Sequence, residues 1–167
     1  DAASFFSAVQ CMGWLIDKGA DVNGVADKYG LRPLHFVVQG EFGGKGERQK
    51  YQGRNFTKRE LHLSAYLVRS LAGLLLLLRA GADPTAGDWK NETFIHATVD
   101  DDSSRKTRIL CDLMLRLSPD NYATVVSAIR KCWHCKNDKG LTVERIFSSL
   151  GMTLEEGEEP EFFEVAG

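Results

Sequence analysis

The sequence has few cysteines, no long apolar segment and no strong excess of charge of either sign. Its four cysteines in 167 residues, Cys11, Cys111, Cys132 and Cys135, are too few for a disulfide-rich scaffold, and a chain of this size does not need one. We therefore expect an intracellular protein, cytoplasmic or nuclear, in a reducing environment. The net charge of −2 argues against a broad basic surface for nucleic acid or a membrane.

No segment of the sequence is typical of a membrane span or a secretory signal. The most apolar run, Leu71 to Leu78, lies between Arg69 and Arg79 and is far shorter than the roughly 20 residues that a spanning helix needs. It predicts a buried helix instead. Because the chain begins at Asp1 and not at a methionine, we expect a segment of a longer protein or a processed terminus.

The sequence also lacks the common catalytic motifs. It has no Ser/His/Asp arrangement and no zinc-binding HExxH, and the glycine-rich residues 40–46 lack the spacing of a phosphate-binding loop. His62 and His134 have no acid or nucleophile at a suggestive spacing. We therefore expect no enzyme activity and no cofactor.

Two segments of the chain repeat the same order of residues. Residues 17–37 read DKGADVNGVADKYGLRPLHFV, and residues 79–97 read RAGADPTAGDWKNETFIHA. In both, a helical run ends at Gly-Ala-Asp, and a polar turn then leads into a new helix. Gly30 and Asn91 suit the positive φ of a tight turn, and Thr93 suits the N-cap of a helix. The repeated layout predicts units of helices separated by hairpin loops.

The stretches DKYGLRPLH and, more loosely, DWKNETFIH resemble the ankyrin repeat. Arg32 replaces the family's Thr and Phe94 replaces its Pro, while NDKGLTVERIF at residues 137–147 is a third, degraded copy. The resemblance implies an all-α fold, an ankyrin-like repeat array of antiparallel helix pairs joined by hairpin loops, with a degenerate C-terminal capping repeat. It also implies that His35 and His96 bind the backbone of a neighbouring hairpin.

The spacing of the copies shows where this array departs from the family. His35 and His96 are 61 residues apart, whereas the family period is about 33. The excess predicts a long insertion in the first repeat, at the glycine-rich, basic segment of about 41–60. We therefore expect an ankyrin-like domain over 1–150 and an acidic tail over 151–167 that is flexible unless it docks. Helices are expected at about 4–18, 33–40, 61–80, 103–118, 121–133 and 141–151.

The motif Cys132-Trp133-His134-Cys135 raises the alternative of a metal-binding or redox-sensitive domain. A CxxC pair can hold zinc or exchange thiols, and Cys111 is the one plausible further cysteine ligand. No second pair lies nearby, however, and the motif follows a predicted helix instead of preceding one. We therefore favour packing cysteines and no metal site, and keep as alternatives this domain type and a regulatory segment of a longer enzyme.

In ankyrin repeats, the hairpin tips and the following inner helices form a concave binding surface. Trp89 at a tip is not required by such a fold, and an aromatic residue beside acids suits a Lys- or Arg-bearing peptide. Alternatively, Trp89 packs under the insertion, and Asp100 to Asp102 form a solvated loop or hold a cation. We predict a non-catalytic protein-interaction module that binds another protein or a basic peptide through Tyr29, Trp89, Lys90, Glu92, Asp100 and Asp101.

Overall fold

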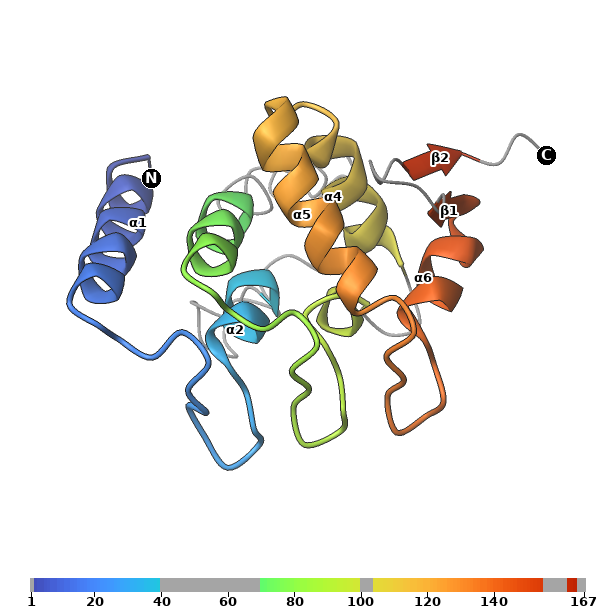
Figure 1. Ribbon diagram of the computed structural model, residues 1–167, viewed down its shortest axis with the longest axis horizontal. Helices are drawn as coiled ribbons and strands as arrows, with labels where there is room; N and C mark the ends of the chain where they lie inside the picture. The colour runs from blue at the N-terminus through green and yellow to red at the C-terminus, as the bar shows by residue number, and fades with distance from the viewer. Residues whose placement is uncertain (1, 40–69, 100–103, 155–161, 165–167) are drawn as a thin grey trace, which may run out of the picture.

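Helical units, each followed by a long loop that projects to the same side, make up the fold (Figure 1). The computed structural model describes residues 2–39, 70–99, 104–154 and 162–164. The predicted insertion at about 41–60 and the predicted contact residues Asp100 and Asp101 therefore lie outside the described residues.

Helices account for most of the regular structure in the described ranges, which confirms the predicted helical array. They are α1 (Ala2–Asp17), α2 (Pro33–Gln39), a helix over 70–79, the short 3-10 helix η2 (His96–Thr98), α4 (Arg105–Met114), α5 (Pro119–Lys131) and α6 (Val143–Ser149). Local sequence explains the start of α5, where Ser118 accepts a hydrogen bond from the N–H of Asn121 and Pro119 occupies the first turn.

Two short strands near the C-terminus are a feature that the sequence did not predict. β1 (Met152–Leu154) pairs antiparallel with β2 (Phe162–Glu164). Both strands belong to the segment expected to be an acidic tail. Met152 and Leu154 are half-buried and pack against the core, so the start of this segment docks on the last helical unit.

Each of the three loops is built around one side chain that accepts two backbone hydrogen bonds. Oδ1 of Asp27 accepts from the N–H groups two and four residues further on, at 3.0 and 3.2 Å. Asp88 and Asn137 do the same in the second and third loops, at 2.8 to 3.1 Å. The turn residues have the expected positive φ, 72° at Gly30 and 56° at Asn91. Positions that align between the copies in the sequence therefore form the same hydrogen bonds in the three loops.

Buried histidines join each unit to the next loop, as the resemblance implies. Nε2 of His35 lies 2.6 Å from the carbonyl oxygen of Glu92, and Nε2 of His96 lies 2.8 Å from that of Leu141. In each ring, Nδ1 accepts from the N–H three residues earlier, at 3.1 Å. This bonding assigns the proton to Nε2, which donates to the carbonyl oxygen of the next loop. We call this contact between a histidine and the next loop a joint. The third copy has the exposed Arg145 at the corresponding position.

Thr93 does not cap a helix, in contrast to the prediction. Its hydroxyl oxygen lies 2.9 Å from Nδ1 of His96, and its N–H donates to the same nitrogen. The inner segment of this unit winds only into η2, which has no side-chain cap. In the third copy, where no histidine competes for the hydroxyl, Thr142 does cap α6 by accepting from the N–H of Arg145 at 3.2 Å. The Thr93 hydroxyl, which would otherwise cap the helix, is thus bound to His96 instead.

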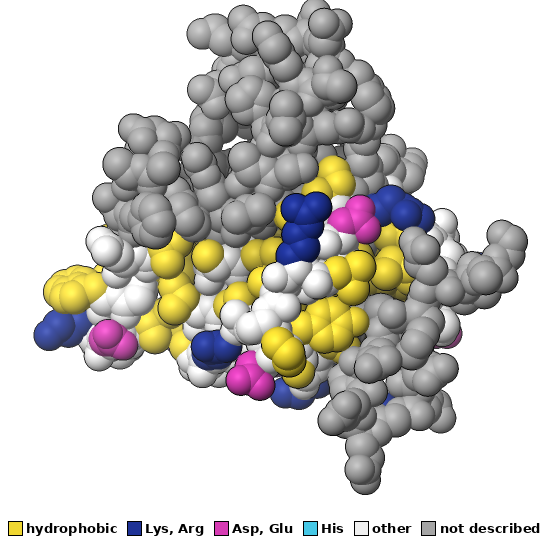
Figure 2. Space-filling view, turned by 90° about the horizontal axis from the view of Figure 1, so that it is seen from above, with side chains coloured by type: hydrophobic (Ala, Val, Ile, Leu, Met, Phe, Trp, Pro, Cys, Tyr) yellow, Lys and Arg dark blue, Asp and Glu magenta, His cyan; other side chains and the backbone are white. Residues whose placement is uncertain are grey.

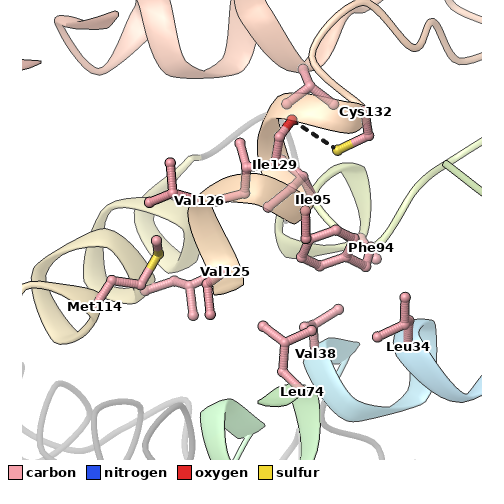
Figure 3. Close-up of a cluster of buried hydrophobic side chains, with 14 of the residues drawn as sticks. Leu34, Val38, Leu74, Phe94, Ile95, Met114, Val125, Val126, Ile129 and Cys132 are labelled. Atoms are coloured by element: carbon pink, nitrogen blue, oxygen red, sulfur yellow. Dashed lines mark hydrogen bonds between the residues drawn. The ribbon is translucent and has the colours of Figure 1, made fainter. Parts of the chain in front are cut away.

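One hydrophobic core is shared between neighbouring units. Figure 3 shows buried side chains that face one another from α2, the helix over 70–79, the two residues before η2, α4, α5 and the residue after α5. The labelled side chains are Leu34, Val38, Leu74, Phe94, Ile95, Met114, Val125, Val126, Ile129 and Cys132. Val38, Leu74 and Ile95 are completely buried although they come from separate elements. Because each unit buries its apolar face against its neighbours, the core holds the loops in a fixed row.

We expect His96→Ala to lower the free energy of unfolding by about 2 kcal/mol or more, because it removes the hydrogen bonds of the ring to Leu141 and Thr93 and leaves a cavity at a buried site. Arg145→Ala is the matched control, since it changes the same repeat position where the side chain is exposed, and we expect less than about 0.5 kcal/mol there. Urea unfolding measures both variants. Equal losses would contradict the role of the histidine in the joint.

Candidate functional site

An exposed aromatic pair lies at the tips of the first two loops. Tyr29 and Trp89 have ring centroids 5.6 Å apart, with their planes tilted by 53°. Tyr29 is 43% exposed and Trp89 is 60% exposed. Rings at this separation and tilt attract one another. The two tips therefore present one aromatic surface to the solvent, and Trp89 is not packed into the core.

Backbone hydrogen bonds between successive tips hold this pair in place. The N–H of Trp89 donates to the carbonyl oxygen of Tyr29 at 2.8 Å, and the N–H of Asp138 donates to that of Lys90 at 3.0 Å. Each tip is also closed by its own aspartate or asparagine. Because this backbone is ordered before any partner arrives, less conformational entropy is lost when the surface binds.

Two lysines flank the aromatic pair. Nζ of Lys28 lies 5.0 Å from the ring centroid of Tyr29, and Nζ of Lys90 lies 5.1 Å from that of Trp89. Both distances allow a cation–π attraction. The expectation of acidic residues around Trp89 depended mainly on Asp100 and Asp101, which lie outside the described ranges. The charged groups that lie over the described rings are these two ammonium groups.

Three of the six predicted contact residues come together at the tips, namely Tyr29, Trp89 and Lys90. Glu92 lies lower in the second loop and is half-buried. Its N–H donates to Asp88 at 2.9 Å and its carbonyl oxygen faces His35, so its backbone belongs to the joint. Its predicted role in contacting a partner stays a prediction.

Lys28 is the residue at the tips that the predicted contact set left out. The signal that could have found it is a lysine directly beside an aromatic residue in both tips, Lys28-Tyr29 in the first and Trp89-Lys90 in the second. The order is reversed between the two copies, so a position-by-position alignment hides the similarity. Only the structure shows that each lysine lies over its neighbouring ring.

The face seen in Figure 2 has no large patch of one charge. Hydrophobic side chains spread between separate Lys or Arg and Asp or Glu side chains. Nucleic-acid and membrane surfaces depend on clustered basic side chains. The described part of this face therefore gives no support to polyanion binding, in agreement with the net charge of −2.

The two histidines of the joints are poorly suited to act as catalytic bases. His35 is 1% exposed and His96 is 3% exposed, and both ring nitrogens of each have hydrogen-bond partners. Burial lowers the pKa of His96 below its usual 6.5, although its bond to Leu141 acts in the opposite direction. These rings are structural donors and acceptors.

The cysteines of the CxxC motif are held as neutral thiols. Burial raises the pKa of Cys132 to about 12, and its Sγ lies 3.4 Å from the carbonyl oxygen of Ile129. Burial also raises the pKa of Cys135, with a further contribution from the nearby Asp83 charge. The thiolate is the form that exchanges disulfides and binds metals. The environment therefore favours the neutral thiols over the thiolates.

No group of three or more metal-ligating side chains is found in the described ranges. Cys111 is buried, with its pKa raised to about 12 by burial. His134 is exposed and lies 3.5 Å from Glu144, with which it can form a surface pair. The metal-binding or redox alternative thus has no geometric support among these residues.

Comparison with protein families supports the predicted resemblance for the N-terminal part of the chain. The family model described as Ankyrin repeats (many copies) matches residues 1–44, which include the first loop and His35. Comparison with curated proteins gives no match. Among the residues with a described placement, no helix combines the length and apolar character needed to cross a membrane.

We expect the depressed pKa of His96 to make stability depend on pH. His96 binds a proton more readily in the unfolded chain than in the folded one. The contribution of the neutral ring to the free energy of unfolding is therefore fully present above pH 6.5 and is lost as the pH falls below that value. NMR titration of His96 should give a pKa under 6.5. His96→Gln should lose less of its unfolding free energy between pH 7.5 and 5 than the wild type. A parallel loss in both proteins would refute this account.

The four thiols should differ sharply in reactivity. Cys11 is exposed, whereas Cys111 and Cys132 are buried with pKa values of about 12. With a colorimetric disulfide reagent at pH 8, we expect the two buried thiols to react at least about 100-fold more slowly than Cys11 until the protein unfolds. Cys11→Ser should remove the fast phase. A fast phase that survives this change would show that the CxxC thiols are reactive.

Proposed function

We propose that this chain is a non-catalytic protein-interaction module and that a partner protein docks on the tips of the first two loops. Ankyrin repeats generally act as protein-interaction modules, and the matching segment includes the first tip. The observation that carries the proposal is the exposed Tyr29–Trp89 pair, held by a backbone hydrogen bond between the tips.

Several properties of this pair favour binding over a purely structural role. The joints and the core account for the stacking of the units, so the fold does not depend on an indole ring that is 60% exposed. Large aromatic side chains supply much of the binding energy at protein interfaces when they become buried. At roughly 25 cal/mol per Å² of apolar surface removed from water, covering both rings is a substantial gain.

The proposed surface extends beyond the pair to the other predicted residues. Lys90 flanks Trp89 directly, and Glu92 lies where the second loop returns to the helices. Asp100 and Asp101 follow η2 in the sequence and are proposed as further contact residues. The basic-peptide partner predicted from the sequence depends on these acids.

We expect Trp89→Ala to weaken partner binding at least about 10-fold, because the substitution removes the largest exposed ring of the pair. Trp14→Ala is the matched control: Trp14 is 59% exposed and has Lys18 5.8 Å over its ring, but it lies in α1. Affinity capture with mass spectrometry identifies the partner, and calorimetry with the purified partner gives the two affinities.

The outcome separates the tips from the rest of the surface. Unchanged affinity in Trp89→Ala, or an equal loss in Trp14→Ala, would remove the tips as the binding site. Replacing Asp100 and Asp101 together by Lys tests these two further contact residues independently, since a loss of affinity there with no loss in Trp89→Ala would move the site away from the tips.

A further inference from the structure

We infer that the partner segment on Tyr29 and Trp89 is acidic, with carboxylate side chains next to an apolar or aromatic one. This inference rests on the proposed function and names the chemistry of its partner. It reverses the charge predicted from the sequence, for reasons that lie in the lysines of the two tips.

Each ring of the pair already has a cation of its own. Lys28 lies over Tyr29 and Lys90 lies over Trp89, at 5.0 and 5.1 Å from the ring centroids. A Lys or Arg of a partner that approached the rings would be repelled by these ammonium groups. A carboxylate would instead be attracted to both ammonium groups without disturbing the aromatic contacts.

Three aspartates near the tips each have one carboxylate oxygen bound within the loops. Asp27 and Asp88 each direct Oδ1 to two backbone N–H groups, and Oδ1 of Asp138 accepts from Nδ2 of Asn91 at 2.7 Å. Glu92 is half-buried at the base of its loop. The lysines differ, because within the described residues neither Lys28 nor Lys90 forms an ion pair.

The tips therefore offer two exposed ammonium groups, one over each ring of an exposed aromatic pair. The tip backbone fixes the separation of the two positions through the bond from Trp89 N–H to the Tyr29 carbonyl oxygen. An extended acidic segment can place carboxylates at both lysines while an apolar side chain covers the indole. Opposite charge at the rim and apolar contact at the centre is the usual arrangement of a specific interface.

Single-stranded nucleic acid also combines negative charge with rings that stack on aromatic side chains. Such binding normally uses a continuous basic groove along the backbone. Here two lysines flank the pair, the third loop adds Lys136 and Lys139 without an aromatic partner, and the net charge is −2. The observations favour an acidic peptide, and the experiment distinguishes the two.

Selection from a phage-displayed library of random 12-residue peptides tests this inference on the full chain. We expect the enriched sequences to be rich in Asp and Glu beside an aromatic or aliphatic residue. A synthetic peptide of the enriched sequence should bind at least about 10-fold more weakly when Lys28 and Lys90 are both replaced by Glu. It should also bind more weakly as salt rises from 50 to 300 mM.

Replacing Lys136 and Lys139 by Glu is the matched control, since it makes the same change of charge at a tip without aromatic rings and should leave the affinity within about 2-fold. Circular dichroism checks that both double variants fold. Net-basic enriched peptides that need Trp89 would overturn the acidic partner while leaving the proposed site intact. Enriched peptides that bind Trp89→Ala unchanged would overturn the site as well.

Two other results would also overturn the inference. One is a selection that yields no binder dependent on Lys28 and Lys90. The other is tighter binding of a 12-nucleotide single-stranded thymidine oligonucleotide than of any selected peptide, with the same dependence on these lysines. That second result would assign the tips to nucleic acid.

Discussion

One kind of buried contact, between an imidazole and a backbone carbonyl, is made twice and fixes how neighbouring units are joined. His35 reaches the second loop at Glu92, and His96 reaches the third loop at Leu141. Each ring is also fixed from its own unit by a backbone N–H, so its orientation is not free to change. These contacts fix the position of each loop relative to the preceding unit. The exposed tips are therefore also held in place, although they take no part in the core.

Much of the fold could be predicted from the sequence because its rules are local. A glycine or asparagine with positive φ, an aspartate that closes a loop, and a histidine in the first turn each act within a few residues, and the copies repeat them. Thr93 was misread because its hydroxyl can serve either a helix N-terminus or a histidine ring, and only the buried joint decides between them. The pairing of β1 with β2 connects residues on either side of an acidic stretch, where neither apolar periodicity nor a turn motif indicates a hairpin.

The candidate site was predictable in part. Trp89 could be singled out because nothing in the repeat pattern requires it, but its contact with Tyr29 could not. Successive tips are staggered by one residue, as the hydrogen bonds from Trp89 to Tyr29 and from Asp138 to Lys90 show. Aligned positions are therefore not the positions that meet in space. The positions of the two lysines could not be predicted either, since side-chain direction and not sequence proximity places them over the rings.

The two joints form the same contacts, although the number of residues between equivalent loop positions differs. Asp27 and Asp88 are 61 residues apart, whereas Asp88 and Asn137 are 49 apart, and both spacings exceed the family period of about 33. The entropic cost of closing a longer connection grows only slowly with its length. Sequence length between joints is therefore weakly constrained in this architecture. Such a chain can acquire or lose whole segments between its helices during evolution while the spacing of its loops, and with it the surface they present, is conserved.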